Sequence, residues 1–173
     1  MNSTKKIALT AILSALAVVF LLLGSFLETV TLSAAAIASL LTVVAVCELG
    51  YSYAFSVWAI ASILGLLLLP IKDPVLYFAC FFGYYPIVKS LAEKIKSKLS
   101  YLIKLGVFTA AYILTAFVGI KLFAPEADVI KYLLIGFPLL LIVFLVFDFA
   151  LTRLIIYYQK SLRNRLGIDK FLK

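Results

Sequence analysis

Long apolar runs separated by short polar turns dominate this sequence. A bilayer with a hydrocarbon core of roughly 30 Å takes about 20 helical residues to cross, and six runs of about this length fit the chain. The pattern therefore predicts an all-α fold, a polytopic membrane bundle of six transmembrane helices that forms a single integral membrane domain over residues 1–173. The predicted spans are 6–24, 30–49, 51–70, 74–92, 100–123 and 129–158.

Glycine and proline mark the ends of several runs. Gly50 suits the end of the second helix, Pro70 closes the third span, and Pro74 suits the first turn of the fourth. The first run, Ile7 to Gly24, follows two lysines as the core of a signal peptide would. Its 18 residues exceed the roughly 7 to 15 of a signal core, and the residues after it make a poor cleavage site. We interpret this run as the first span.

Composition supports lipid as the solvent of most of the chain. Of 173 residues, 65% are hydrophobic, and the mean hydropathy is +1.18, more apolar surface than a soluble domain of this size buries. The net charge of +8 does not indicate nucleic-acid binding, because the basic residues concentrate at the edges of the apolar runs. Histidine is absent, and Cys47 and Cys80 lie 33 residues apart, so neither a metal site, a cofactor nor a disulfide framework is expected.

The basic residues also predict an orientation. With both termini cytoplasmic, thirteen of the 16 lysines and arginines lie on the cytoplasmic side or at its edge. The remaining three are Lys72, Lys121 and Lys131. Because cytoplasmic loops carry an excess of Lys and Arg, we expect the N-terminus and the C-terminus to be cytoplasmic, which requires an even number of spans.

Small residues form helical faces that allow close packing in lipid. Ala8, Ala11 and Ala15 lie on one face of the first helix. This face either packs against another helix of the same chain or docks a partner subunit. Similar faces in the second and third helices comprise Ala34, Ala38, Thr42, Ala54, Ala61 and Gly65.

The fourth run carries an aromatic stripe. Tyr77, Phe81 and Tyr84 share a helical face shortly before Pro86, and a proline within a span frees backbone groups that protein or a cavity must satisfy. Such a stripe packs in the core, faces lipid or binds a ligand. In the ligand-binding interpretation, Glu28, Lys72 and Asp73 would cap the substrate pocket from the outer loops. Charges in such short loops are more often simply solvated.

Ionisable residues inside the membrane are functional candidates by default. Here they are Glu48, Lys89, Asp148 and Arg153. All four are expected near the cytoplasmic ends of their helices, either snorkelling or mutually paired, and Asp148 is the deepest. The sequence contains neither a phosphate-binding loop, a zinc-protease motif, a nucleophile elbow nor paired intramembrane aspartates, so an enzyme is not expected.

Taken together, these features resemble the substrate-binding S components of energy-coupling factor (ECF) transporters. The resemblance rests on the lysine and alanine pattern from Lys5 to Ala15, on Leu49-Gly50 followed by Ala54, on the six-helix plan, and on a last helix with Asp148 and a basic exit. It implies that Ala8, Ala11 and Ala15 face a coupling transmembrane subunit, that separate ATPase subunits energise uptake, and that a vitamin-like small molecule binds in an outward-facing pocket. It also implies a multi-pass protein of a bacterial-type plasma membrane.

Two rival functions stay open at this point. A non-transport assembly or regulatory subunit would use the small-residue and aromatic faces for packing alone, with no ligand pocket. A small dimeric secondary carrier would show inverted repeats, and residues 1–73 and 74–173 show no convincing likeness.

The orientation can be tested with reporters fused to full-length chains. We expect a fluorescent protein fused at either terminus to fluoresce, and alkaline phosphatase inserted beside Asp73 to be active, since the turn there is predicted to lie outside. Phosphatase activity at a terminus would contradict the predicted orientation.

Overall fold

The computed structural model describes residues 3–95, 98–123 and 129–162, and all regular secondary structure within them is helical. Six helical segments are long and apolar enough to cross a membrane. They are α1 (Ser3–Phe26), α2 (Thr31–Glu48), α3 (Tyr51–Leu68), the composite segment Asp73–Ala92, α6 (Lys98–Phe123) and α7 (Val129–Tyr157). The predicted all-α fold with six apolar helices is therefore confirmed.

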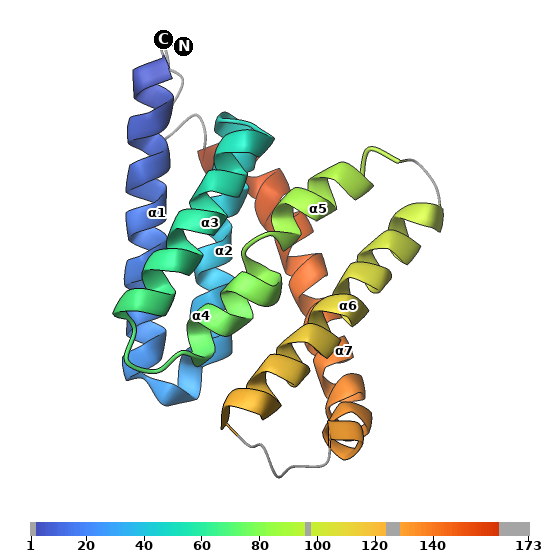
Figure 1. The fold of residues 1–173 in the computed structure, drawn as a ribbon. Coiled ribbons are helices and arrows are strands. Elements are labelled where there is room, and N and C mark those ends of the chain that lie inside the picture. The colour runs from blue at the N-terminus through green and yellow to red at the C-terminus, as the bar shows by residue number, and fades with distance from the viewer. Residues whose placement is uncertain (1–2, 96–97, 124–128, 163–173) are drawn as a thin grey trace.

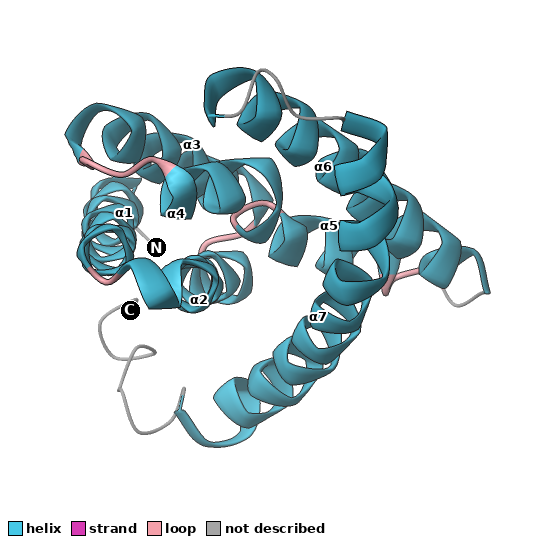
Figure 2. Ribbon diagram, turned by 90° about the horizontal axis from the view of Figure 1, so that it is seen from below, coloured by secondary structure: helices cyan, strands magenta, loops and turns pink. Residues whose placement is uncertain are grey.

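Helices α1, α2 and α3 pack side by side, with α2 also contacting the fourth segment and α7 (Figures 1 and 2). A 3-10 turn, η1 (Glu28–Val30), links α1 to α2, and a π-helical turn, η3 (Tyr158–Leu162), continues α7. Helices α6 and α7 run obliquely beside this group (Figure 1). We call the side where α1 begins the N-terminal end of the bundle; α3 begins there, and α5 and α7 end there.

Small residues allow α1, α2 and α3 to approach closely. Ala35, Ala38, Ala45, Ala54 and Ala61 are fully buried. At the opposite end of the bundle, a Cβ atom added to Gly24 of α1 would collide with the Cβ of Ala34 on α2. Dispersion contacts at such short range hold helices together in lipid, where hydrophobicity contributes little to their association.

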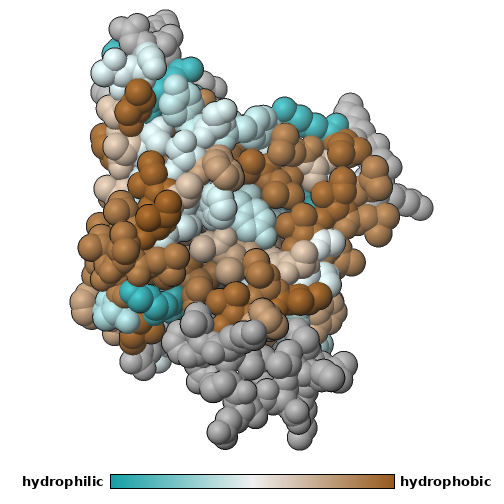
Figure 3. All heavy atoms as spheres, in the orientation of Figure 1, coloured by the Kyte–Doolittle hydropathy of each residue, from teal (hydrophilic) through white to brown (hydrophobic). Residues whose placement is uncertain are grey.

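The outward faces of the helices are largely apolar, as the brown areas of Figure 3 show for one face of the molecule, and α6 and α7 are the least buried of the six segments among the described residues. Leu102, Ile113, Leu139 and Val146 are among many large hydrophobic side chains left exposed. A contiguous apolar surface of this extent requires a covering of lipid or protein, which agrees with six membrane-crossing helices.

The fourth segment is not one continuous α-helix. It consists of α4 (Asp73–Tyr77), a π-helical turn η2 (Phe78–Phe82), a short turn and α5 (Tyr85–Ala92). The N–H of Gly83 donates to the carbonyl oxygen of Phe78 at 2.7 Å, five residues back, and Pro86 has no N–H to donate. The span predicted over 74–92 is present, but its backbone pattern changes within the aromatic stripe.

Trp58 of α3 stabilises this interruption. Its indole N–H donates to the carbonyl oxygen of Ala79 at 3.1 Å, an oxygen that would accept from Gly83 in a regular α-helix. A Cβ atom on Gly83 would collide with the Trp58 ring and lie 2.8 Å from the Phe78 ring and from the Phe78 carbonyl oxygen. Only glycine therefore lets the Trp58 ring lie over the turn.

Substitution of Gly83 tests this packing. Gly83→Ala should lower the free energy of unfolding by roughly 1–3 kcal/mol, because the added methyl group forces Trp58 and Phe78 apart. Gly106→Ala on α6 is the matched control, since a Cβ there meets nothing within 4 Å and alanine favours helix by up to about 1 kcal/mol. Thermal unfolding of both variants in detergent would measure the difference, and equal stability would contradict the packing argument.

Candidate functional site

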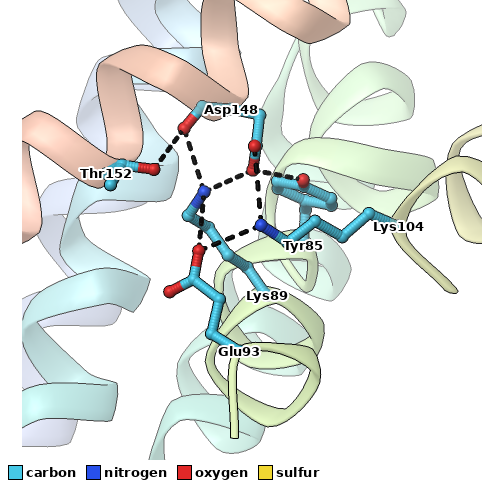
Figure 4. Close-up of polar contacts among 6 residues, drawn as sticks. All are labelled: Tyr85, Lys89, Glu93, Lys104, Asp148 and Thr152. Atoms are coloured by element: carbon cyan, nitrogen blue, oxygen red, sulfur yellow. Dashed lines mark hydrogen bonds and ion pairs between the residues drawn. The ribbon is translucent and has the colours of Figure 1, made fainter. Parts of the chain in front are cut away.

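A buried lysine lies at the centre of the most extensive polar network among the described residues. Lys89 of α5 is 0% exposed. Its ammonium group pairs with the carboxylate of Asp148 on α7, donates to the Asp148 carbonyl oxygen at 2.9 Å, and lies 3.2 Å from Oε1 of Glu93 (Figure 4). The two acidic residues approach this lysine from different helices, one from α7 and one from the end of α5 (Figure 4).

Three further side chains complete the network. The Tyr85 hydroxyl donates to Oδ1 of Asp148 at 2.6 Å. Lys104 of α6 lies 3.0 Å from Oε1 of Glu93 and 3.5 Å from Oδ2 of Asp148, and the Thr152 hydroxyl donates to the Asp148 carbonyl oxygen at 2.9 Å. The Asp148 network, as we call these six residues, thus joins α5, α6 and α7.

The Asp148 network is balanced in formal charge. It contains two ammonium groups and two carboxylates, and each ammonium group contacts both carboxylates. Charges removed from water need partners and hydrogen bonds to offset their desolvation, and the cost is greatest at membrane depth. The arrangement therefore keeps ionised groups tolerable inside an apolar bundle, but it makes each of them depend on the others.

An aromatic cluster adjoins the network through Tyr85. The Phe81 ring lies 4.9 Å from the Tyr85 ring, 5.8 Å from Phe108 of α6 and 5.9 Å from Phe144 of α7. Phe147 of α7 adds a further contact to Tyr85 at 5.8 Å. These rings fill the space between the fourth segment, α6 and α7, and they surround the network's tyrosine with apolar material.

Of the four intramembrane charges singled out from the sequence, the structure unites two. Lys89 and Asp148 are paired, whereas the Arg153 guanidinium lies over the Phe149 ring, 5.1 Å from its centroid. Glu48 instead accepts a hydrogen bond from the Tyr158 hydroxyl at 3.2 Å. Lys89 does not snorkel, although it is close to a helix end: its side chain is fully buried and its ammonium group is held by Asp148 and Glu93.

Sequence reasoning missed Glu93, Lys104 and Tyr85. The spacing of Lys89 and Glu93, four residues apart on a helix, is a recognisable pairing signal. Lys104 is the fifth residue of the predicted span 100–123, so its position likewise indicates an intramembrane charge. Nothing in the sequence identified Tyr85 over its neighbour Tyr84 as the partner of Asp148.

The three aromatic residues proposed for a substrate pocket have different surroundings. Phe81 is buried in the aromatic cluster, and Tyr77 is half-buried against the same core. Tyr84 instead meets the Trp58 ring of α3 edge-on, at 5.8 Å. The π-helical turn places Tyr84 in different surroundings from Tyr77 and Phe81. Its extra residue rotates all following positions of the helix by about 100°.

The charges predicted for the outer loops have local structural roles where their side chains are described. The Lys72 ammonium group turns back and donates to the carbonyl oxygens of Leu66 (2.7 Å) and Leu69, so it caps the end of α3. Asp73 lies in the first turn of α4, where a negative charge is favourable. The side chain of Glu28 lies outside the described part of the structure.

Ser25 makes two hydrogen bonds to the connection between α3 and α4. The Ser25 hydroxyl at the end of α1 donates to the Ile71 carbonyl oxygen at 3.0 Å and accepts from the Ile71 N–H at 2.9 Å. Both backbone groups of Ile71 are thereby satisfied, which fixes the connection between α3 and α4 onto α1.

The alanine face of α1 is exposed. Ala8, Ala11 and Ala15 all lie on the outside of the bundle, while the opposite face of α1 is buried through residues such as Leu13 and Ala17. By contrast, the small residues of the corresponding faces on α2 and α3 are buried: Ala34, Ala38, Thr42, Ala54, Ala61 and Gly65. Packing among the residues that the structure describes therefore does not account for the alanines of α1.

Comparison with known protein families, with curated proteins and with solved structures finds no match for this chain.

The Asp148 network predicts a dependence on charge balance. Lys89→Met should destabilise the protein by roughly 3 kcal/mol, because it leaves the partly buried Asp148 carboxylate without its closest charged partner. Combining it with Asp148→Asn should restore most of this loss, since Lys104 and Glu93 then remain as a balanced pair. Thermal unfolding in detergent would measure both effects.

Lys94→Met is the matched control, because Lys94 is exposed and its ammonium group lies over the Tyr51 ring at 4.7 Å. Its loss should cost only about 0.5–1 kcal/mol. A double variant no more stable than Lys89→Met alone would contradict the charge-balance argument.

Proposed function

We propose that this chain is the membrane-embedded substrate-capture subunit of an uptake transporter of the ECF type. In this role it binds a vitamin-like small molecule from outside a bacterial-type plasma membrane and depends on separate ATPase subunits and a coupling transmembrane subunit. It is not itself an enzyme, and its N-terminus and C-terminus are cytoplasmic.

The exposed alanine face of α1 is the observation that carries the proposal. Ala8, Ala11 and Ala15 leave a shallow strip along the outside of the helix, and large apolar side chains such as Ile12 and Leu16 flank it. In lipid, strips of small residues favour helix association because they let backbones approach closely. This strip fits a helix of the coupling subunit, as the resemblance to S components implies.

The fourth segment supports a capture role. Non-helical or irregular backbone at membrane depth is tolerated where protein or a cavity satisfies it, and π-helical turns often occur at functional sites. Here the interruption lies beside the half-exposed rings of Trp58 and Tyr84. We place the substrate against this aromatic surface, on the side that leads to Asp73.

A second candidate function is an assembly or regulatory subunit that binds no small molecule. The packing of Phe81 favours it, because this predicted pocket residue lies among Phe108, Phe144 and Phe147 instead of lining an open cavity. In that case the alanine face would still dock a partner, but the aromatic rings would serve only as core.

Purification from the native membrane separates these functions. Tagged protein isolated in mild detergent should bring down two ATPases, one coupling subunit and a bound small molecule, all identified by mass spectrometry. Ala11→Leu combined with Ala15→Leu should reduce recovery of the coupling subunit and the ATPases at least tenfold, because leucine fills the strip. The small molecule should stay bound.

Ala110→Leu is the control, since Ala110 is an exposed alanine of α6 and should leave recovery unchanged. Recovery of other membrane partners without a small molecule would support the assembly role. Unchanged recovery of the coupling subunit and the ATPases with the Ala11→Leu and Ala15→Leu double variant would contradict docking through the alanine face.

A further inference from the structure

Helix α7 is attached to α5 mainly by side chains, whereas α6 also approaches the backbone of the fourth segment. Among the described residues, the backbones of α5 and α7 approach each other little, and α7 comes near α2 at only a few positions. Tyr85 and Lys89 span the gap from α5 to Asp148. Helices α6 and α7 are the least buried of the six apolar segments among the described residues, and Figure 3 shows brown, apolar surface over α6.

The aromatic contacts between α7 and the fourth segment are replaceable by lipid. Phe147 lies 4.7 Å from Phe82, and Phe144 lies 5.5 Å from Tyr85. Because lipid chains are as apolar as these rings, separating them in a bilayer forfeits little hydrophobic free energy. The polar contacts of Asp148 are different, since lipid offers no substitute for them.

The network also contains a second acceptor for its lysines. Lys89 and Lys104 each contact Glu93 as well as Asp148. Glu93 belongs to the end of α5, and its side chain is 42% exposed. If α7 moves away with Asp148, both ammonium groups still have the Glu93 carboxylate beside them. Because Glu93 is partly exposed, they also gain a route to water. The open arrangement therefore leaves no buried cation without a counter-charge.

We propose that the Asp148 network is a reversible latch, whose release lets α7 separate from α5 at the N-terminal end of the bundle. Asp148 is the closing group, because among the described residues it makes the hydrogen bonds and ion pairs that join α7 to Tyr85, Lys89 and Lys104. Glu93 is the group that sustains the open arrangement, because it retains the lysines. The proposal does not depend on the substrate-capture function, since it concerns the attachment of one helix to another.

The latch predicts opposite effects for its two carboxylates. Asp148→Asn removes the closing charge and should populate an open form. Glu93→Gln removes the alternative acceptor, so the lysines should hold Asp148 more tightly and the closed form should dominate. A network with a purely structural role predicts instead that both variants loosen the packing.

Electron-spin distance measurement on the full chain in phospholipid nanodiscs tests this prediction. Cys47 and Cys80 are replaced by alanine, and spin labels are attached at Ser52→Cys on α3 and Tyr157→Cys on α7, two exposed positions. Helix α3 reports on the body of the bundle because the Tyr51 hydroxyl lies 3.1 Å from Ser90 of α5. In Asp148→Asn we expect a second population at a distance longer by at least about 5 Å, one helical turn.

Tyr85→Phe provides a milder opening variant that keeps the aromatic ring, in case Asp148→Asn does not fold. It should also populate the longer distance, and adding Glu93→Gln should suppress that population. Tyr112→Phe is the matched control, because Tyr112 packs against Phe137 within the α6–α7 pair; its distances should equal those of the parent. The proposal is overturned if the opening variants show only the parent distance, or if Glu93→Gln increases the longer population.

Discussion

The ammonium group of Lys89 has no access to water, and the arrangement of the last three helices depends on how it is neutralised. A cation at this depth must find its counter-charge in the protein. Asp148 provides that charge from a position 59 residues further along the chain. The ion pair with Lys89 therefore fixes where Asp148 lies along α5. Lys104 of α6 contacts the same carboxylate. A shift of α7 by one turn would leave both lysines with Glu93 as their sole carboxylate in the network.

The network in turn depends on the interruption of the fourth segment. The π-helical turn and Pro86 end one helical register and begin another. In the second register, Tyr85 and Lys89 are four residues apart and face the same carboxylate. Trp58 makes the interruption tolerable in lipid because its N–H satisfies a backbone oxygen that the turn releases. A tryptophan of α3 thus helps to position an ion pair between α5 and α7.

The two halves of the bundle differ in what holds them together. Helices α1, α2 and α3 are joined by close contacts of small residues, which need an accurate fit and leave little room for movement. Helix α7 meets the fourth segment mainly through long polar side chains and aromatic rings, whereas α6 also approaches the backbone of that segment. The first group of helices also carries the exposed alanines of α1. The chain therefore joins α1, α2 and α3 by close packing of small residues, and α7 to α5 by polar and aromatic side chains.

By itself the sequence determined the helical class, the six apolar segments and their approximate ends, because a run of apolar residues bounded by glycine, proline or charge is a local property. It also identified Lys89 and Asp148 as candidates, since any charge inside such a run is conspicuous. Only the tertiary structure decided that these two residues pair, that Glu93, Lys104 and Tyr85 join them, and that the alanine face of α1 is exposed while similar faces on α2 and α3 are buried. These features depend on which helices lie side by side. The pattern along a helix shows which residues share a face, but only contacts between distant segments determine what that face meets.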